Sequence, residues 1–268
     1  MASSETILHE NKAYWTQRAG SYSEVNQNEL NTMQRGIWRH ELRIHIERQF
    51  PDRDAASIRV LEVGTGPGFF AILLAELGYD VTAVDLTPAM LTEARKNAGS
   101  LAERITFLEM NAEALSFDDD SFDVLLSRNL TWNLPHPEEA YREWKRVLKP
   151  GGLLLNFDAN WYRYLFDREA RSAYEADRKT TAERGFEDQN VGENFDVMED
   201  IARRVPLSRA ARPAWDREVL SSLGMCVLTD TQAWKRVWSR EEKTFFASTP
   251  MFLVCAVQPP KPQRRRQP

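Results

Sequence analysis

The sequence predicts an α/β protein with a mostly parallel sheet that is covered by helices on both faces. Between residues 58 and 158, strand-like segments alternate with helix-like ones. The strand-like segments are apolar throughout, which is typical of strands buried on both faces. Three glycines in the stretch VLEVGTGPGFF (60–70) separate the first strand from the first helix of this alternation. Together these features favour a doubly wound, Rossmann-like sheet with a ligand near the glycines.

The elements of this alternation can be assigned in order. IRVLEV (58–63) predicts a buried strand and 69–77 a helix with an apolar stripe. A second strand is expected at 80–85, and Thr87 as N-cap with Pro88 at the first helical position begins a helix that continues through Asn97. The rest of this half is predicted as strands at 104–110 and 122–128, a helix at 137–148 that Lys149–Gly152 terminates, and a strand at 152–158.

The flanking segments follow different patterns. Residues 1–48 predict helices with no strand, and residues 159–212 are polar, aromatic and helix-leaning. Regular order returns with a helix at 215–223 and strands at 225–230 and 250–258. We therefore divide the chain into an N-terminal helical lid (1–48), a cofactor-binding core (49–158), a helical cap over the acceptor (159–212), a completion of the core sheet (213–258) and a basic disordered tail (259–268).

Composition narrows the class of protein. The chain has 268 residues, a net charge of −5, and a basic end, KPQRRRQP, which leaves the rest more acidic than the whole. An acidic body argues against a large nucleic-acid-binding face. No apolar run is long enough for a membrane span, and the start lacks a signal-peptide pattern. Cys226 and Cys255 have no metal-binding or disulfide spacing, so we expect a cytoplasmic protein without a metal site.

The glycine loop predicts a close approach of the backbone to a ligand. Gly64, Gly66 and Gly68 follow the first strand, and glycines let a ligand come near without intervening Cβ atoms. Their spacing fits neither the dinucleotide fingerprint G-x-G-x-x-G nor a Walker loop. Asp85, at the end of the second strand, strengthens the prediction, because a carboxylate there can accept two hydrogen bonds from the vicinal hydroxyls of a ribose.

Four stretches, read together, resemble the class I S-adenosylmethionine-dependent methyltransferases, and among them the small-molecule branch of ubiquinone-type methyltransferases. They are EVGTGPGF (62–69), VDLTPAML (84–91), NAEALSFDDDSFD (111–123) and RVLKPGGLLL (146–155). The resemblance covers about residues 57–158. It implies a seven-stranded sheet whose last strand inserts antiparallel, and S-adenosylmethionine as the cofactor.

The resemblance also implies roles for individual residues. Glu62 and the Gly64–Gly68 loop would hold the methionine end of the cofactor, and Asp85 the ribose. The other implied cofactor contacts lie around the adenine and in the cleft after the fourth strand. The complete predicted cofactor set is Glu62, Gly64, Thr65, Gly66, Gly68, Asp85, Leu86, Met90, Asn111, Ala112 and Arg128. Asn111 departs from the family, which usually has Asp there; an amide oxygen can still accept from the adenine amino group.

The acceptor must be sought outside this shared core. YWTQRAGSY (14–22) resembles an opening found in many of these enzymes, and its aromatic residues share one helical face. They are expected to form a lid, although simple packing explains them about as well. Aromatic residues in 159–212 suggest an acceptor pocket with apolar walls, or again only packing. The predicted acceptor set is Tyr14, Trp15, Tyr22, Asn129, Trp132, Asp158, Asn160, Trp161 and Tyr162, with His136, Asp158 and Tyr22 as candidate bases.

The sequence therefore predicts methyl transfer to a small-molecule acceptor, with the nucleophilic atom left open. A nucleic-acid methyltransferase would be expected to carry N-P-P-Y/F after the fourth strand, where this chain has SRNLTW (127–132). A non-catalytic protein that only binds S-adenosylmethionine would be expected to have a damaged glycine loop or ribose acid, and both are intact here. An assay of methyl transfer on a panel of metabolites separates these three alternatives.

Overall fold

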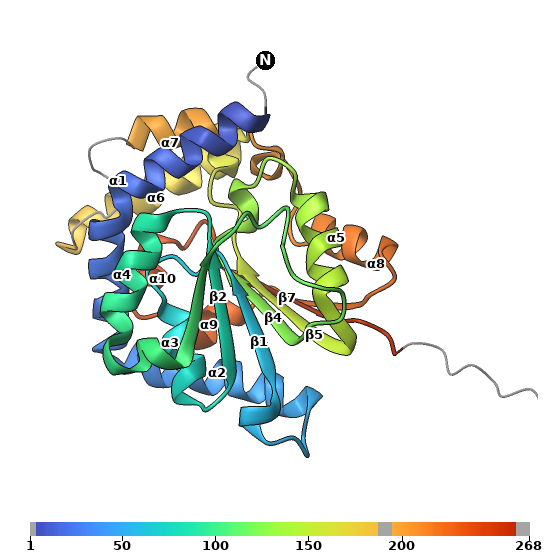
Figure 1. The fold of residues 1–268 in the computed structure, drawn as a ribbon. Coiled ribbons are helices and arrows are strands. Elements are labelled where there is room, and N and C mark those ends of the chain that lie inside the picture. Colours follow the sequence, from blue (N-terminus) through green and yellow to red (C-terminus); the bar gives the residue numbers. More distant parts are fainter. Residues whose placement is uncertain (1–3, 187–194, 261–268) are drawn as a thin grey trace, which may run out of the picture.

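The protein folds around one seven-stranded sheet with the strand order β3-β2-β1-β4-β5-β7-β6, of which only β7 is antiparallel to its neighbours (Figure 1). The structure, a computed structural model, describes residues 4–186 and 195–260. The strands are β1 (Arg59–Val63), β2 (Asp80–Asp85), β3 (Ile105–Glu109), β4 (Phe122–Arg128), β5 (Leu148–Asp158), β6 (Cys226–Asp230) and β7 (Phe252–Val257). This arrangement confirms the predicted fold class, including the antiparallel last strand. The chain order reverses between β1 and β4, where a parallel sheet opens a crevice beyond its carboxyl ends.

Helices cover both faces of this sheet and the carboxyl ends of its strands. They are α1 (Ser4–Leu30), α2 (Met33–Gln49), α3 (Phe69–Glu76), α4 (Pro88–Ala98), α5 (Pro137–Val147), α6 (Arg168–Glu183), α7 (Phe195–Ala202), α8 (Ala214–Ser222), α9 (Ala233–Val237) and α10 (Glu242–Phe245). Alternate residues of a strand pack in two different apolar cores, because successive side chains of a strand point to opposite faces of the sheet. Val60 packs in the core with α2, α3 and α9, whereas its neighbour Leu61 packs in the core with α5 and α8.

The helices outside the two sheet faces form a roof at the carboxyl ends of the strands. Figure 1 shows α1, α6 and α7 at this end of the sheet, with α1 and α7 side by side. A third apolar cluster joins them, with Ile7 of α1, Trp132 after β4 and Met198 and Ile201 of α7 buried together. No helix in the described ranges is both long and apolar enough to cross a membrane.

Two details of the predicted elements were wrong. The fifth strand begins at Leu148, four residues before the predicted start, because Leu148 pairs with Phe122 and the ladder shifts register before it continues at Val124. Gly152 lies inside this irregular strand, where a Cβ atom would come within 2.7 Å of the Lys149 carbonyl oxygen. The second difference is that α9 and α10, between β6 and β7, were not predicted; at five and four residues they are too short to show helical periodicity.

Candidate functional site

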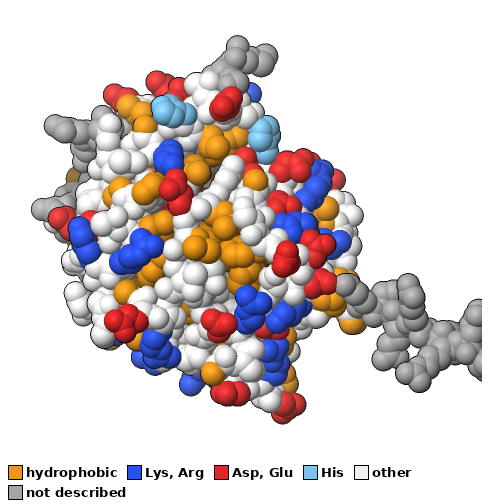
Figure 2. All heavy atoms as spheres, viewed as in Figure 1, with side chains coloured by type: hydrophobic (Ala, Val, Ile, Leu, Met, Phe, Trp, Pro, Cys, Tyr) orange, Lys and Arg blue, Asp and Glu red, His pale blue; other side chains and the backbone are white. Residues whose placement is uncertain are grey.

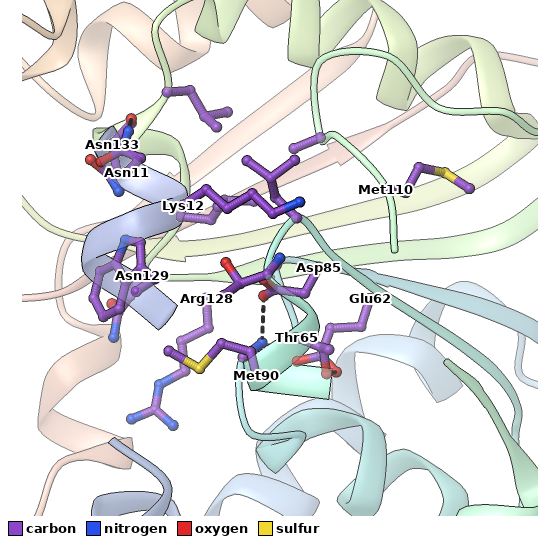
Figure 3. A pocket seen from close by; sticks show the side chains of 18 of the residues that line it. Asn11, Lys12, Glu62, Thr65, Asp85, Met90, Met110, Arg128, Asn129 and Asn133 are labelled. Carbon is purple, nitrogen blue, oxygen red and sulfur yellow. Dashed lines mark hydrogen bonds between the residues drawn. The ribbon is translucent and has the colours of Figure 1, made fainter. Parts of the chain in front are cut away.

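A cavity lies at the carboxyl ends of β1, β2 and β4, beneath α1. It contains about 980 Å³ of space free of protein atoms, including its open mouth. Figure 3 shows Glu62, Thr65 and Asp85 at its sheet side and Lys12 extending across it from α1. In the space-filling view, hydrophobic side chains gather in the middle of the same face and charged ones lie mostly around them (Figure 2). We call this cavity the first cavity. The predicted cofactor residues that line it are Glu62, Gly64, Thr65, Gly66, Asp85, Leu86, Met90, Asn111, Ala112 and Arg128.

The three loop glycines have positive φ angles but serve different purposes. A Cβ atom on Gly64 would clash with the side chain of Leu130 at 2.7 Å, and one on Gly68 would press on Ala94 of α4 at 3.0 Å. Gly68, although in the predicted cofactor set, does not line the first cavity. Its close packing against α4 explains why a glycine is needed there. Gly66 has φ +52° and borders the first cavity, and there a Cβ atom would meet only the ring of Tyr22 at 3.6 Å.

Asp85 holds the glycine loop in place from the end of β2. Its Oδ2 accepts a hydrogen bond from the backbone N–H of Gly66 at 2.9 Å, and its Oδ1 accepts one from Thr87 N at 2.9 Å. Burial raises the pKa of Asp85 in spite of these bonds. Thr87 is the N-cap residue of α4, as predicted, but its side chain makes no cap bond; Asp85 instead accepts from its backbone N–H. Since each carboxylate oxygen can accept more than one hydrogen bond, both remain usable by a ligand.

Glu62 is buried at the end of β1. It is 3% exposed, and its Oε2 accepts a hydrogen bond from the Thr65 hydroxyl at 2.6 Å. Burial, with the charge of Asp85 adding to it, raises the pKa of Glu62 to about 8, although the Thr65 bond opposes the shift. A buried carboxyl group without a cationic side chain bonded to it is a good partner for a cationic ligand group, because such a partner offsets the cost of burying its charge.

Arg128 is neutralised within the protein. Its Nη2 donates to Oε1 of Glu29 on α1 at 2.5 Å, and its guanidinium lies 4.9 Å from the ring centre of Trp38 and 5.0 Å from that of Phe69. Burial opposes its charge, but the carboxylate of Glu29 raises the pKa of Arg128. The residue therefore forms a wall of the cavity and ties α1 to the end of β4.

Asn111 is only partly free to meet a ligand. Its Oδ1 accepts a hydrogen bond from the backbone N–H of Glu113 at 3.0 Å, in a local turn. The amide N–H groups have no hydrogen bond among the described residues. For a purine in this cavity, Asn111 is thus better placed to donate to a ring nitrogen than to act as the acceptor we expected from the sequence.

Only some of the residues predicted to bind the acceptor line the first cavity. Trp15, Tyr22 and Asn129 line the first cavity, whereas Tyr14, Trp132, Asn160 and Tyr162 do not. Tyr14, Trp132 and Tyr162 pack in the apolar cluster beneath α7, and Asn160 donates to the backbone oxygen of Arg212. His136 is exposed at the start of α5, outside the cavity lining.

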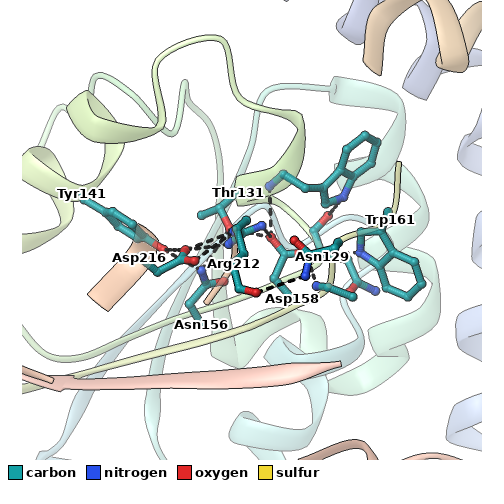
Figure 4. A network of polar contacts seen from close by, with 11 residues as sticks. Asn129, Thr131, Tyr141, Asn156, Asp158, Trp161, Arg212 and Asp216 are labelled. Atoms are coloured by element: carbon teal, nitrogen blue, oxygen red, sulfur yellow. Dashed lines mark hydrogen bonds and ion pairs between the residues drawn. The ribbon is translucent and has the colours of Figure 1, made fainter. Parts of the chain in front are cut away.

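Asp158 lies in a buried polar network instead of at the cavity (Figure 4). Its side chain is 0% exposed, and its Oδ2 accepts from Thr131 Oγ1 at 2.5 Å and from Arg212 Nη1 at 2.7 Å. Its Oδ1 accepts from the indole N–H of Trp161 at 3.1 Å. With its lone pairs occupied in this way, Asp158 is not placed to act as a base, and it positions Trp161.

Sequence reasoning missed the polar residues of α1. Asn11 and Asn26 are 6% and 4% exposed and line the first cavity, and Lys12 lines it as well while pairing with Glu109 at 2.5 Å. Asn11, Trp15, Tyr22 and Asn26 follow one another at spacings of four and seven residues, so they share one helical face. Asparagines on an otherwise buried face were the signal that could have indicated a polar ligand.

A second cavity adjoins the first and shares Tyr22, Arg128 and Asn129 with it. It contains about 1200 Å³ of space free of protein atoms, including its open mouth. Trp161, after β5, is part of its wall, together with aromatic residues from the segment between β6 and β7. Tyr22 stands at the boundary, since it lines both cavities; burial, the largest effect, raises its pKa.

Comparisons with known proteins agree with this arrangement. Residues 61–156 match the family described as a methyltransferase domain. The ubiquinone/menaquinone biosynthesis C-methyltransferase UbiE of Rhodopseudomonas palustris is 34% identical over 142 residues, which are 51% of this chain and 54% of that protein. The chain thus spans about half the length of the curated relatives it matches. Residues 61–156 thus match a methyltransferase domain, as the sequence resemblance predicted.

Solved structures share the fold at low sequence identity. A chain of the complex between the Haloferax volcanii Trm112 methyltransferase activator and a methyltransferase superposes with a TM-score of 0.56 at 17% identity, covering 91% of this chain and 97% of that one. The [4+2]-cyclase SpnF superposes with a TM-score of 0.53 at 17% identity, covering 83% of this chain and 81% of that one. Since a cyclase also has this fold, the reaction must be argued from the site.

Proposed function

We propose that this protein transfers a methyl group from S-adenosylmethionine to a small-molecule acceptor. The observation that carries the proposal is the contact between Asp85 and Gly66, which joins a carboxylate at the end of β2 to the glycine loop after β1. The carboxylate that would bind a ribose and the glycine loop that a ligand can approach closely therefore face one cavity. The positive φ of Gly66 and its open surroundings support the same use.

Each part of the bound cofactor has suitable protein groups in this cavity. Asp85 would accept hydrogen bonds from the ribose hydroxyls, and Glu62 would face the amino group of the methionine end. Leu86, Met90 and Ala112 supply apolar contacts for the adenine ring, and Asn111 a donor. When bound, S-adenosylmethionine supplies a methyl group activated by its sulfonium, so the protein needs chiefly to orient the two reactants and exclude water.

The acceptor would enter from the second cavity. Tyr22 and Asn129 border both cavities, so a molecule in the second cavity could reach the cofactor beside them. Trp161, fixed by its bond to Asp158, would form part of the acceptor's wall. Of the three candidate bases, Tyr22 alone is at this boundary.

The experiment combines binding with turnover. Calorimetry should give S-adenosylhomocysteine a dissociation constant in the micromolar range, about −7 to −9 kcal/mol, and much weaker binding of NAD. Incubation with S-adenosylmethionine carrying a labelled methyl group and a metabolite panel should then transfer label to a small molecule. Binding of NAD without S-adenosylhomocysteine would refute the cofactor assignment. Cofactor binding, with label passing to nucleic acid or to no acceptor of a broad panel, would favour one of the other two functions.

A further inference from the structure

The second cavity presents hydrogen-bond acceptors that no group of the described residues satisfies. Gln34, on α2, is 6% exposed and lines this cavity, and its buried Oε1 has no hydrogen-bond partner in residues 4–186 and 195–260. Its Nε2 donates to Oε2 of Glu242 at 2.5 Å, which fixes the amide with its oxygen unpaired. A buried acceptor without a donor costs free energy, so its presence beside a cavity points to a ligand that brings the donor.

Glu242 provides a carboxylate beside this amide. The hydrogen bonds that it accepts, from Gln34 and from the backbone N–H of Ser239 at 2.7 Å, both go to Oε2. Its Oε1 has no hydrogen bond among the described residues. Burial is the largest effect on this side chain and raises the pKa of Glu242, against the opposing charge of Arg128. A cationic ligand group would stabilise the ionised form of such a buried carboxyl group, because it offsets the cost of burying the charge.

The charges around the cavity favour a cation. Of the lining residues that the structure describes, three are carboxylates, Glu29, Glu241 and Glu242, and one is a cation, Arg128. Arg128 is already paired with Glu29, so it does not neutralise Glu242 by direct contact. An anionic ligand would therefore meet uncompensated negative charge here.

Aromatic rings form the other wall. Phe246 lies edge-on to Trp161, with ring centres 5.2 Å apart, and tilted against Trp238 at 5.7 Å. Phe245 also lines the cavity. Aromatic faces attract organic cations through their quadrupoles as well as packing on apolar groups. A site that combines such rings with a carboxylate and an unpaired amide oxygen suits an amine attached to an apolar body.

We propose that the acceptor is an apolar or aromatic molecule with a protonated amino group, which Gln34 and Glu242 bind in the second cavity while the rest of the molecule extends toward Tyr22 and the first cavity. This assignment of the acceptor class rests on the proposed function. It concerns the group that anchors the acceptor and leaves open which of its atoms is methylated.

The test compares three ligands of the same shape in the presence of saturating S-adenosylhomocysteine. Phenethylamine is the cation, phenethyl alcohol the neutral probe and phenylacetate the anion, and calorimetry measures the affinity of each. We expect the amine to bind at least tenfold more tightly than the alcohol, and phenylacetate not to bind. Equal binding of amine and alcohol, or preference for the anion, would refute an amine anchor and favour a neutral acceptor such as a phenol.

Variants then locate the anchor. Glu242→Gln should lower the affinity for phenethylamine tenfold or more while changing that for phenethyl alcohol less than threefold. Glu218→Gln, an exposed residue of α8 with the same change in net charge, should leave both affinities unchanged. If Glu242→Gln weakens both probes equally, the carboxylate does not recognise the amine. Binding of S-adenosylhomocysteine alone, measured first on each variant, separates a failure of this proposal from a failure of the cofactor assignment.

Discussion

The guanidinium of Arg212 donates a hydrogen bond to the carboxylate of Asp158 at 2.7 Å, and both side chains are fully buried. The same guanidinium also donates to Asp216 on α8 at 2.7 Å and to the hydroxyl of Thr131 after β4. Tyr141 of α5 completes the network through its bond to Asp216 at 2.6 Å (Figure 4). One cation thus connects the ends of two central strands to the helices α5 and α8, at the base of the roof.

Removing this cation should destabilise the fold strongly. Arg212→Met would leave two buried carboxylates without their partner, which typically costs about 3–5 kcal/mol. Urea unfolding monitored by circular dichroism measures the loss. Arg217→Met, at an exposed position in the first turn of α8, is the control and should shift stability by no more than about 0.5 kcal/mol. Similar midpoints for the two variants would show that the network contributes little.

The second prediction separates the two cavities. Trp161→Ala alters only the second cavity, so affinity for S-adenosylhomocysteine should stay within about tenfold, or ~1.4 kcal/mol, while the KM of the acceptor rises or turnover falls. Tyr22→Ala should impair both, because Tyr22 borders both cavities. Calorimetry and acceptor kinetics on folded variants decide this. Loss of cofactor binding in Trp161→Ala with unchanged acceptor selectivity would place the acceptor elsewhere.

The local parts of the site could be predicted from the sequence. The strand at 80–85 was expected with the bounds found, and Asp85 at its end lies opposite the glycine loop because parallel neighbours β1 and β2 end at the same edge. Such a juxtaposition depends only on strand order and on where apolar runs stop. The same reasoning predicted the turn at Gly66. This residue has a positive φ angle, which glycine adopts without the cost of a Cβ clash.

The parts that depend on distant pairing could not be predicted. Arg128 and Glu29 are 99 residues apart, and nothing in either local pattern indicates that they pair. Asp158 was expected at the cleft because it ends β5, but its carboxylate turns toward Arg212, 54 residues later in a segment without strand or helix periodicity. The apolar pattern of a sequence specifies which faces are buried, whereas the choice of polar partner is made by tertiary packing.

Asp85 is predicted to contribute to cofactor affinity. Asp85→Asn keeps the shape but removes the charge from its bonds to a ribose, which should weaken S-adenosylhomocysteine binding by about 1.5–3 kcal/mol. Asp80→Asn, at the exposed start of the same strand, should leave affinity unchanged. Calorimetry on both variants tests the role, and equal affinities would show that the acid only caps the turn at Thr87.

Gly66 and Gly99 form a matched pair for testing the loop. Both have φ +52°, and a Cβ atom at Gly99 would meet nothing within 4 Å. Ala at either position strains the backbone, because L side chains rarely adopt a positive φ, so Gly66→Ala and Gly99→Ala should both lose stability. Only Gly66→Ala should also weaken S-adenosylhomocysteine binding, because only Gly66 borders the first cavity. Equal affinity in the two variants would mean that the ligand does not approach this loop.

Glu62 should make both stability and cofactor binding depend on pH. Its pKa in the folded protein is about 8, above the ordinary value of 4.5, so the folded state keeps a proton that the unfolded chain has lost between these values. Stability should therefore fall as pH rises through this window, by at most about 1.4 kcal/mol per unit from this group, and level off above pH 8.

A cationic amino group of the ligand prefers the ionised carboxylate of Glu62, so S-adenosylhomocysteine affinity should rise over the same pH interval, by up to about tenfold per unit. Glu62→Gln cannot ionise, and in this variant both slopes should be reduced by those amounts. Urea unfolding and calorimetry at pH 6, 7 and 8 measure them. If the wild-type and Gln profiles run parallel, Glu62 does not titrate in this range and does not bind the amino group of the ligand.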